Sequence, residues 1–533
     1  MRILTASDHA LLVEAADLDE AMRLNLAWRG VHGVVERIPG ARTVLVRFDP
    51  LVVSAVDLAD ALAATEVDAA HLPATGEVTV PVRYDGEDLD EAASLLGVSG
   101  DELVNRHLAA DWKVAFSGFA PGFGYVVSTD PLFAVPRRAS PRTRVPAGSV
   151  ALAGQFTGVY PRESPGGWQL IGRTDAQMWD IDRDPPALLS PGTTVRFEHV
   201  REQVVMSVMV SENADHAADS GRVPERHAAA AAPAPESPAS AAIEIVRPSL
   251  QLLVQDAGRP GFAALGVSAS GVADRRAMRD ANRAVGNETG AAVLESVGGA
   301  VLRFRGAGVA AVTGAVGSLD LVDAGGVVRR IAHGEPFATV DGDELTLGHP
   351  AGGLRFVVAV RGGVAAESAL DSRASDTLAG LGPAALAAGD VVRVGDRARH
   401  PVEPDALPRV LPAPGDLVDL EITLGPRDDW FTAEALATLG AQEWTVTPRS
   451  DRVGIRLEGA QPLERAIGGE LPSEGAVTGA IQVPPDGQPV LFLPDHPLTG
   501  GYPIIGAVTD SSLDLAGQLP PGARVRFIVK ETS

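Results

Sequence analysis

Residues 166–172 read GGWQLIG, and much later in the chain residues 500–506 read GGYPIIG. The likeness continues downstream, where PGTTVRF at 191–197 returns as PGARVRF at 521–527. Loops of different length separate the blocks in the two copies, as happens when a set of strands is shared and its loops drift. The blocks therefore predict two related domains on one chain.

A third pair of blocks lies upstream of the first two and keeps the same order. Gly148 and Gln155 are spaced as Gly475 and Gln482 are, and each glycine is followed two positions later by a valine. The separation between the copies far exceeds the period of about 20–50 residues that marks a repeat array. We therefore expect a domain pair and not a solenoid.

Length and hydropathy favour an ordinary globular protein. The chain has 533 residues, and 45% of them are hydrophobic. At about 150 residues per domain, this length predicts roughly three or four domains with packed cores. The sequence shows neither the apolar run of about 20 residues that a membrane helix needs nor an N-terminal signal pattern. We expect a cytoplasmic protein that does not enter a membrane.

Residue counts exclude several classes of site. The chain has no cysteine, and its 11 histidines form no His-x-x-x-His or His-x-His pair, so we expect no tightly bound metal. A net charge of −24 argues against binding to nucleic acid. Only Lys113 and Lys530 are lysines, and neither completes a Gly-x-x-x-x-Gly-Lys-Ser/Thr loop. Any nucleotide must be held by other groups.

One segment reads as a linker. Residues 211–242 are dominated by Ala, Pro, Ser and charged residues and offer almost nothing to bury. Such a segment cannot offset its ordering entropy and is predicted to be a flexible tether. It divides the chain into 1–210 and 243–533, and the repeated blocks lie at the end of each part.

The first part begins with a small α+β module, which we place at 1–80. Strands are predicted at 10–13, 43–48 and 78–82, and helices at 18–30 and 56–64. Two further helices are predicted at 88–96 and 101–110. From residue 112 onward, short β-prone runs between glycines and prolines predict an antiparallel barrel or sandwich that completes the domain at 81–210.

The second part, 243–533, has the same β-rich character. Strands are predicted at 250–254, 309–313, 354–360, 418–424 and 490–493. The clearest helix is 275–285, because Gly286 and Asn287 follow it in the usual C-terminal position. The fold class is therefore mainly β with α+β parts.

Residues 116–125, FSGFAPGFGY, concentrate glycines and aromatic residues. Glycine permits backbone turns and a close approach to a ligand, so the segment is either a tight turn over an aromatic core or a binding loop. Four arginines follow at 137, 138, 142 and 144 among prolines. They suit either a clamp for a carboxylate or phosphate, or a solvated basic loop.

The second part carries polar residues among glycines at loop positions. Gln255, Asp256 and Arg259 precede Ser270-Gly271-x-x-Asp274, and Asn287 and Glu295 follow. Such groups indicate a polar site more than a core. There is no Gly-x-Ser-x-Gly elbow, and no Ser–His–Asp triad can be assembled by spacing. Residue patterns alone therefore reach paired β domains with polar, glycine-rich loops.

Longer strings carry a family resemblance. FSGFAPGFGY, PRRASPRTRVPAGSVALAG and YPRESPGGWQLIGRT resemble subunit 1 of the allophanate hydrolase family, also called the kinase-inhibitor-like family or the family of the 5-oxoprolinase B subunit. LLVQDAGRPGF, SGVADRRAMRDANRAVGN, RVGIRLEG, IQVPPDGQPVLFLPD and TGGYPIIGAVTD resemble subunit 2, the family of the 5-oxoprolinase C subunit. The chain thus resembles a fusion of both, an arrangement similar to the carboxyltransferase region of urea amidolyase.

The resemblance implies cyclophilin-like β-barrels in both halves, packed together with a site between them. It implies ATP-dependent opening of 5-oxo-L-proline to L-glutamate, with ATP and Mg, beside a separate 5-oxoprolinase A subunit of the LamB/YcsF family and with little activity alone. A homo-oligomer is compatible with it as well. Two alternatives stay open: a biotin-dependent carboxyltransferase component, and a non-enzymatic regulator of a histidine kinase.

The same resemblance implies site residues. Phosphorylating a lactam oxygen needs arginines and amides around developing negative charge. The catalytic candidates are Asp256 and Arg259, with His107 as the acid–base group because of its intrinsic pKa. The candidates for binding substrate or nucleotide are Gly118, Pro121, Gly122, Phe123, Arg137, Arg138, Arg142, Gln155, Gly166, Gly167, Trp168, Gln255, Asp274, Asn287, Glu295, Arg452, Glu474, Gln482, Gly500, Gly501 and Tyr502.

Overall fold

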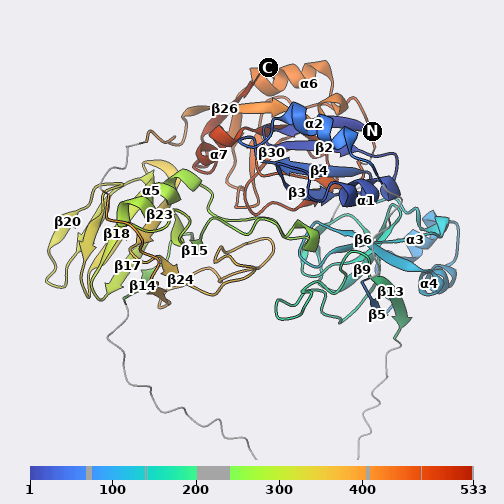
Figure 1. The fold of residues 1–533 in the computed structure, drawn as a ribbon, viewed down its shortest axis with the longest axis horizontal. Coiled ribbons are helices and arrows are strands. Elements are labelled where there is room, and N and C mark those ends of the chain that lie inside the picture. Colours follow the sequence, from blue (N-terminus) through green and yellow to red (C-terminus); the bar gives the residue numbers. More distant parts are fainter. Residues whose placement is uncertain are drawn as a thin grey trace, which may run out of the picture.

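A computed structural model describes residues 1–67, 75–138, 140, 142–200, 241–403, 409–469 and 471–530 (Figure 1). The chain is mostly β with few helices, as predicted. The predicted linker lies outside the described residues up to 240, and its predicted end is slightly late, because Ala242 already begins strand β14 (Ala242–Arg247). In the described residues, no helix is both long enough and apolar enough to span a bilayer.

The N-terminal module is a four-stranded sheet in the order β1-β2-β4-β3 with two helices on one face. Its strands are β1 (Arg2–Ser7), β2 (Ala10–Glu14), β3 (Val34–Pro39) and β4 (Thr43–Phe48), and its helices are α1 (Leu18–Ala27) and α2 (Ala55–Ala64). Asp17 and Ser54 start the two helices, because their side chains accept hydrogen bonds from Glu20 N and Asp57 N.

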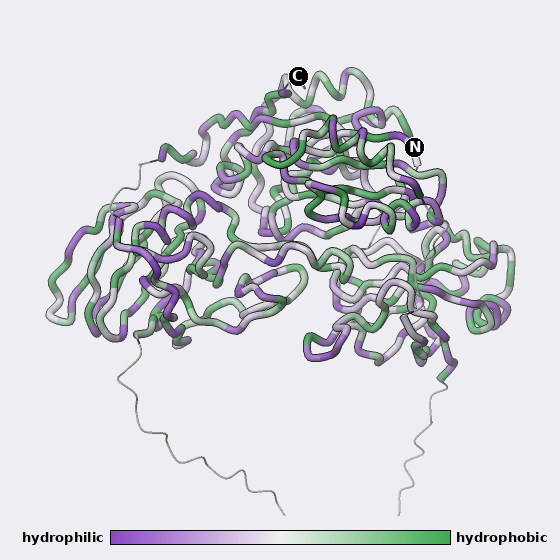
Figure 2. The backbone as a smooth tube through the Cα atoms, viewed as in Figure 1, coloured by the Kyte–Doolittle hydropathy of each residue, from purple (hydrophilic) through white to green (hydrophobic). Residues whose placement is uncertain are grey.

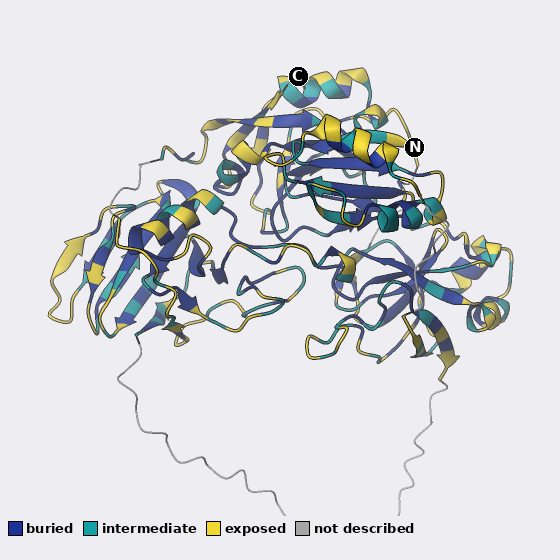
Figure 3. Ribbon diagram, viewed as in Figure 1, coloured by how far each residue is buried: buried dark blue, intermediate teal, exposed yellow. Residues whose placement is uncertain are grey.

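Both faces of this sheet are buried, which explains the unbroken apolar run of β2. Successive side chains of a strand point to opposite faces. Leu11 and Val13 therefore pack under the helices, and Ala10 and Leu12 pack on the second barrel described below. Figure 3 shows the central strands β2 and β4 as mostly buried, with exposed residues on the outer faces of the helices. The module thus joins the first half of the chain to the second.

The first barrel is a seven-stranded sheet in the order β12-β9-β10-β7-β6-β13-β5. Its strands are β5 (Glu77–Val82), β6 (Trp112–Ser117), β7 (Gly124–Ser128), β9 (Ser149–Ala153), β10 (Phe156–Val159), β12 (Gln169–Arg173) and β13 (Thr194–His199). Helices α3 (Leu89–Leu95) and α4 (Gly100–Ala109) connect β5 to β6. A single bridge between Arg83 and Arg173 joins the two edges, so the barrel is nearly closed.

The second barrel repeats this order and is fully closed, as β26-β33-β30-β31-β28-β27-β34. Its strands are β26 (Leu417–Leu424), β27 (Trp444–Val446), β28 (Gly454–Glu458), β30 (Ala480–Gln482), β31 (Val490–Phe492), β33 (Ile504–Val508) and β34 (Arg524–Val529). Helix α6 (Ala433–Ala441) follows β26, and α7 (Asp510–Ala516) follows β33. The predicted pair of related barrels is confirmed by the matching strand order.

The register shows how closely the two barrels correspond. Val195 lies opposite Trp112 in the first barrel, and Val525 lies opposite Trp444 in the second. Each tryptophan donates its indole N–H to the backbone oxygen of the residue five positions before it, over 2.8 Å and 3.0 Å. The downstream blocks of the predicted duplication therefore occupy equivalent places.

The upstream pair of blocks was aligned incorrectly from the sequence. Gly172 lies opposite Val150, and its counterpart Gly506 lies opposite Ile481. The residue two before Ile481 is Gly479, which has a positive φ as Gly148 does, so Gly148 corresponds to Gly479 and not to Gly475. Gly475 belongs to the short strand β29 (Glu474–Gly475) instead. The shared Gly and Gln spacing was a coincidence, because strand pairing fixes the register.

Residues 242–403 form two further sheets around one core, besides the second barrel. One has the order β20-β19-β22-β17-β14-β25-β24, and the other β15-β16-β23-β18-β21. Their strands are β15 (Gln251–Gln255), β16 (Val293–Val297), β17 (Val301–Arg305), β18 (Gly308–Val316), β19 (Leu319–Val322), β20 (Val328–Arg330), β21 (Phe337–Thr339), β22 (Glu344–Leu347), β23 (Gly352–Val360), β24 (Val364–Ala365) and β25 (Val391–Val394). Helix α5 (Arg275–Val285) packs on β18 and β23, and Gly286 ends it as predicted.

Short loops tie these parts together near the centre of the molecule. The 3-10 turn η2 (Ala263–Leu265) reaches the first half, where Gly122 N donates to Leu265 O over 3.3 Å. Glu36 accepts hydrogen bonds from Gly261 N and Ala263 N over 3.0 Å and 3.2 Å. Figure 2 shows hydrophobic stretches along strands of the N-terminal module, whereas polar residues lie on helices and other strands as well as in the turns.

Candidate functional site

A cavity of about 770 Å³ lies between the first and second barrels. The first half supplies Phe119, Phe123, Tyr125, Arg137, Arg138, Arg142, Thr143, Tyr160, Pro165, Gly166, Gly167 and Trp168. The second half supplies Arg456, Arg465, Gly469, Ser473, Gln482, Pro485, Pro497, Thr499, Gly500, Gly501 and Tyr502. The repeated Gly-Gly-aromatic blocks of both halves therefore meet at one site.

An aromatic wall from the first half forms one side of the cavity. Phe123 meets Trp168 edge to face, with ring centroids 5.2 Å apart, and Tyr160 at 5.3 Å. Phe119 lies against Phe123 at 5.4 Å in the same manner. The FSGFAPGFGY segment is thus both a tight turn over aromatic packing and part of a cavity wall, and such edge-to-face pairs stabilise its shape.

Two of the predicted clamp arginines are held by a buried carboxylate. Asp88 accepts from Arg138 over 2.7 Å and from Arg142 over 2.8 Å and 2.9 Å. Burial acts to raise the pKa of Asp88, but the hydrogen bond from Arg142 and the nearby guanidinium charges hold that pKa below its usual range. Arg144 is exposed and pairs with Glu163. These three arginines have carboxylate partners of their own.

Arg137 differs from its neighbours. Its Nη2 donates to Ser473 Oγ over 2.8 Å, a contact between the two halves of the chain. Among the described residues, no carboxylate forms an ion pair with it. Arg137 therefore brings to the cavity a positive charge that the protein does not neutralise directly.

Two cavity arginines were missed as site residues from the sequence. Arg456 lies on β28 between the buried residues Ile455 and Leu457, so strand alternation directs it outward and could have identified it. Arg465 is partly buried, and its guanidinium carbon lies 5.8 Å from the centre of the Tyr502 ring, within cation–π range. Burial lowers the pKa of Arg465. No sequence pattern marks this residue.

The glycine pairs leave room for polar groups of the cavity. A Cβ on Gly501 would lie 1.9 Å from Arg137 Nη1, and one on Gly166 would lie 2.2 Å from the Tyr160 hydroxyl. A Cβ on Gly118 would lie 2.6 Å from Thr499 Oγ1. Real Cβ atoms do not approach so closely, so a side chain at any of these positions would have to displace its neighbour, and glycine leaves these polar groups where they are.

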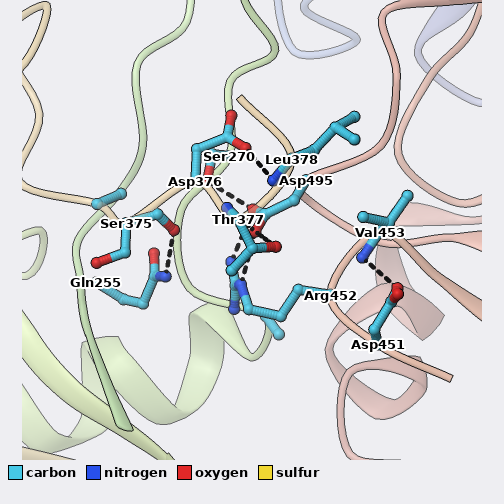
Figure 4. A network of polar contacts seen from close by, with 12 residues as sticks. Gln255, Ser270, Ser375, Asp376, Thr377, Leu378, Asp451, Arg452, Val453 and Asp495 are labelled. Carbon is cyan, nitrogen blue, oxygen red and sulfur yellow. Dashed lines mark hydrogen bonds and ion pairs between the residues drawn. The ribbon is translucent and has the colours of Figure 1, made fainter. Parts of the chain in front are cut away.

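Two predicted site residues of the second half, Arg452 and Glu295, belong to a separate buried network around Asp495, and Figure 4 shows its Arg452 and Asp495. Arg452 pairs with Asp495 over 3.0 Å and also with Glu295, and it is fully buried. Burial acts to lower the pKa of Arg452, but the charges of Asp495 and Glu295 outweigh this effect and raise it. Asp495 also accepts from Ser270 Oγ over 2.7 Å and from Thr377 Oγ1 over 2.8 Å.

Asp376 lies beside this network and is nearly buried. Burial and the negative charge of Asp495 raise its pKa to about 6. It accepts hydrogen bonds from Ala379 N over 2.7 Å and from Ser268 Oγ over 3.1 Å. The network connects the two-sheet region to the second barrel through paired charges.

Asp256 and Arg259, predicted to be catalytic, hold the 369–375 loop in place. Asp256 accepts from Ser372 Oγ and Arg373 N, both over 2.6 Å. Arg259 is buried and donates to the backbone oxygens of Ala369 and Ala374. Neither residue lines the cavity that contains Arg137.

Other predicted residues of the second half also make internal contacts. Gln255 donates to Ser375 O, Asp274 caps helix α5 through Ala277 N, and Asn287 bonds Asn282 Oδ1 and Val360 O. Glu474 pairs with Arg427 in a buried contact that also includes Glu14 of the N-terminal module. Of the candidates from this half, Gln482, Gly500, Gly501 and Tyr502 line the cavity.

His107 lies in the core of the first barrel. Its side chain is fully buried, with Nδ1 2.8 Å from the Tyr84 hydroxyl and Nε2 3.0 Å from Thr157 Oγ1. Burial lowers the pKa of His107 to about 3, so the ring is neutral near pH 7. It does not line the cavity. Its surroundings are those of a core residue.

The remaining first-half candidates do not line the cavity themselves. Gly118, Pro121 and Gly122 shape the turn that carries Phe119 and Phe123, whereas Gln155 is exposed in the turn between β9 and β10. Gln155 is therefore not brought to the cavity. Its supposed counterpart Gln482 is brought there, in keeping with the corrected register.

Comparisons with known proteins agree on one family. Residues 1–189 match the family model "Carboxyltransferase domain, subdomain C and D", and residues 265–529 match "Carboxyltransferase domain, subdomain A and B". Over 175 residues the chain is 42% identical to the 5-oxoprolinase B subunit of Escherichia coli O157:H7, covering 32% of this chain and 80% of that protein. Over 290 residues it is 31% identical to the 5-oxoprolinase C subunit of Escherichia coli K12, covering 54% of this chain and 90% of that protein.

Two further proteins are similar to this chain. Urea amidolyase of Lachancea kluyveri is 31% identical over 314 residues, which cover 54% of this chain and 17% of that enzyme. The crystal structure of TTHA0988 is 32% identical, with a TM-score of 0.78, and the match covers 97% of this chain and 99% of that one. The fused arrangement of both halves therefore also occurs in a solved structure.

Proposed function

This chain belongs to the carboxyltransferase-domain family that includes the B and C subunits of 5-oxoprolinase, and we propose that it performs the roles of both. The proposed reaction is the ATP-dependent opening of 5-oxo-L-proline to L-glutamate, together with a separate A subunit of the LamB/YcsF type. Similarity to the B subunit in the first half and to the C subunit in the second supports the assignment.

The cavity between the barrels is the observation that carries the proposal. Every charged residue among its described lining residues is an arginine, although the whole chain has a net charge of −24. A cleft lined by one sign of charge attracts ligands of the opposite sign. Its volume of about 770 Å³ suits a small molecule, and its aromatic wall suits a planar ring. A small anion beside a nucleotide fits this combination.

The side chains that line the cavity match the groups that the proposed reaction requires. A lactam is a poor electrophile, and transferring the γ-phosphoryl group of ATP to its oxygen activates the ring carbon toward water. Water then adds to that carbon, the ring C–N bond breaks, and hydrolysis of the resulting acyl phosphate by a second water releases glutamate and phosphate. Positioning and charge stabilisation contribute most of the catalysis in phosphoryl transfer. Arg137, Arg456 and Arg465 are placed to contact the negative oxygens, and Mg²⁺ would enter bound to ATP. No lysine-containing phosphate loop is required.

We assign Asp256, Arg259 and Arg452 to holding the architecture and not to the reaction. Their hydrogen bonds are made within the protein, and they do not line the cavity. A proton donor or acceptor for the lactam would come from the cavity or from the A subunit. His107 is too deeply buried in the barrel core to reach a ligand in this conformation.

The proposal is tested by mixing the purified chain with a LamB/YcsF-type A subunit, 5-oxo-L-proline and MgATP. We expect glutamate and ADP to appear in equal amounts, and little of either when one protein is omitted. ADP release without glutamate, or no release with an A subunit that is active with other B and C subunits, would contradict the proposal.

A carboxyltransferase role is the second candidate, because both family models carry that description and urea amidolyase is among the relatives. It requires biotin on a separate carrier protein. Transfer of a carboxyl group from carboxybiotin to a small acceptor, in a reaction independent of the A subunit, would favour this candidate over the first.

A further inference from the structure

Three hydroxyl side chains and one arginine form a cluster on the cavity wall where the two halves meet. Tyr125 and Arg137 come from the first half, and Ser473 and Thr499 come from the second. Tyr125, Ser473 and Thr499 are only 3%, 4% and 1% exposed. Buried hydroxyl groups need partners, so their hydrogen bonds can be assigned one by one.

One backbone N–H donor and one guanidinium donor fix the direction of two of these hydrogen bonds. Phe119 N donates to Thr499 Oγ1 over 2.9 Å, and Arg137 Nη2 donates to Ser473 Oγ over 2.8 Å. Neither donor can accept in return. Thr499 and Ser473 therefore each use one lone pair as acceptors at these contacts.

Tyr125 links the two residues. Its hydroxyl donates its only proton to Ser473 Oγ over 3.2 Å and lies 3.1 Å from Thr499 Oγ1. Because that proton is already used, Thr499 must donate to the Tyr125 oxygen. Ser473 then accepts from both Tyr125 and Arg137, and its own proton has no acceptor among the described residues.

We propose that the Ser473 hydroxyl and the Arg137 guanidinium jointly bind an anionic oxygen of the ligand, either a carboxylate or a phosphate oxygen. Both side chains line the cavity, and Ser473 has a proton to donate. A hydroxyl donor beside a cation, oriented in advance in a site with little water, favours negative charge on the bound oxygen. Tyr125 and Thr499 are positioning residues that act through Ser473.

The pair is complete only when both halves are assembled, since each half supplies one of the two donors. Gly118 and Gly501 belong to the same arrangement. A side chain on Gly118 would displace Thr499, and one on Gly501 would displace Arg137. The assignment rests on the proposed function, which places the ligand in this cavity. It adds which side chains, Ser473 and Arg137, recognise the negative charge of that ligand.

The test measures binding to the full chain by calorimetry, with 5-oxo-L-proline and the non-hydrolysable nucleotide MgAMPPNP as separate probes. Hydrogen bonds to charged groups contribute about 1.5–3 kcal/mol, so Ser473→Ala should weaken binding of one probe roughly 10- to 100-fold. Loss with 5-oxo-L-proline assigns the oxygen to a carboxylate, and loss with the nucleotide assigns it to a phosphate. Ser190→Ala, which removes an internal hydroxyl contact to Ala187 O, is the matched control.

A second pair of variants tests the hydroxyl chain without touching Ser473. Thr499→Val keeps the shape and removes the hydroxyl, whereas Thr499→Ser keeps the hydroxyl. We expect Thr499→Val to weaken binding of the same probe by a smaller factor, and Thr499→Ser to bind it as the unmodified chain does. Thermal melting of each variant separates loss of binding from loss of folding.

The inference is overturned if Ser473→Ala binds both probes like the unmodified chain, or if the unmodified chain binds neither. It is also overturned if Thr499→Ser and Thr499→Val are equally impaired while folded. The proposed function fails separately: no glutamate release in the presence of the A subunit, combined with loss of probe binding in Ser473→Ala, would reject the reaction and keep the oxyanion site.

Discussion

The cavity and the buried network around Arg452 both contain arginines, but they use them differently. Arg452 is fully buried and fully paired, with Asp495, Glu295 and a backbone oxygen as partners. Arg137 and Arg456 face a cavity without a carboxylate partner among the described residues. A paired buried charge holds the structure together, whereas an unpaired charge in a cavity is available to a ligand. The presence or absence of a carboxylate partner therefore separates the two roles where residue type does not.

The largest expected effect is on the stability of the paired network. Arg452→Ala leaves Asp495 buried without its cation and Glu295 with only the more distant Arg355, 3.6 Å away, and such a loss typically costs about 3–5 kcal/mol. Urea unfolding, followed by tryptophan fluorescence, should show an earlier transition. Arg456→Ala is the control from the same segment, because this exposed residue of the cavity should change stability little. Equal loss in both variants would remove the distinction between the two regions.

Asp376 should make the network sensitive to pH. Its folded-state pKa of about 6 lies above the value of an unfolded aspartate, so the folded state binds the proton more tightly. This residue therefore stabilises the fold at low pH, and the contribution falls as pH rises toward 6. The loss is on the order of 2–3 kcal/mol at about 1.4 kcal/mol per pKa unit.

Urea unfolding from about pH 4 to pH 7 measures this dependence, and Asp376→Asn is the comparison because it cannot titrate. We expect the difference in unfolding free energy between the two proteins to change across this range. A constant difference would show that the pKa of Asp376 is not raised in the folded protein.

His107 should matter for folding and not for turnover. It donates and accepts within the first barrel core, and burial lowers its pKa to about 3. Its neutral form therefore supports the fold above about pH 6.5, and this support is lost as pH falls toward 3. His107→Gln should lose about 1 kcal/mol of stability and keep glutamate release near the unmodified rate. A tenfold loss of kcat at unchanged stability would restore His107 as a candidate acid–base group.

The smallest expected effect follows cleavage of the linker between residues 211 and 240. The N-terminal sheet packs on the second barrel through Leu12, Leu45, Ile504 and their neighbours, so the halves share a hydrophobic interface. After cleavage, both fragments should elute together on a sizing column. Separate elution would show that the tether, and not this interface, keeps the cavity assembled.

The sequence predicted the elements well because local signals are strong in this chain. The helix at 275–285 was found with the limits that the structure has, since Asp274 caps one end and Gly286 ends the other. The duplicated barrels were found from the glycine pairs and the Val-x-Phe endings. The upstream block was misaligned because a shared Gly and Gln spacing cannot report which residues face each other across strands.

The candidate site was predicted in part. The FSGFAPGFGY segment, Arg137 and the two Gly-Gly-aromatic blocks do meet at the cavity, because motifs built of glycines and aromatic residues mark close contacts. The polar residues around Asp256 and Arg452 were assigned to the site because sequence does not show whether a charge has a partner. Arg465 was missed because no local pattern marks it. Its place on the cavity wall follows only from the way the two halves pack together.

Glutamate release by Arg137→Ala, with the A subunit and MgATP present, tests the central claim most directly. Arg137 carries the unpaired charge that joins both halves at the cavity, and a charge-assisted contact contributes about 1.5–3 kcal/mol. We predict that kcat/KM falls roughly 10- to 100-fold at unchanged melting temperature, while Arg144→Ala, whose side chain is exposed beside Glu163, keeps the unmodified value. Equal activity of the two variants would contradict the account of the cavity as the site of the reaction.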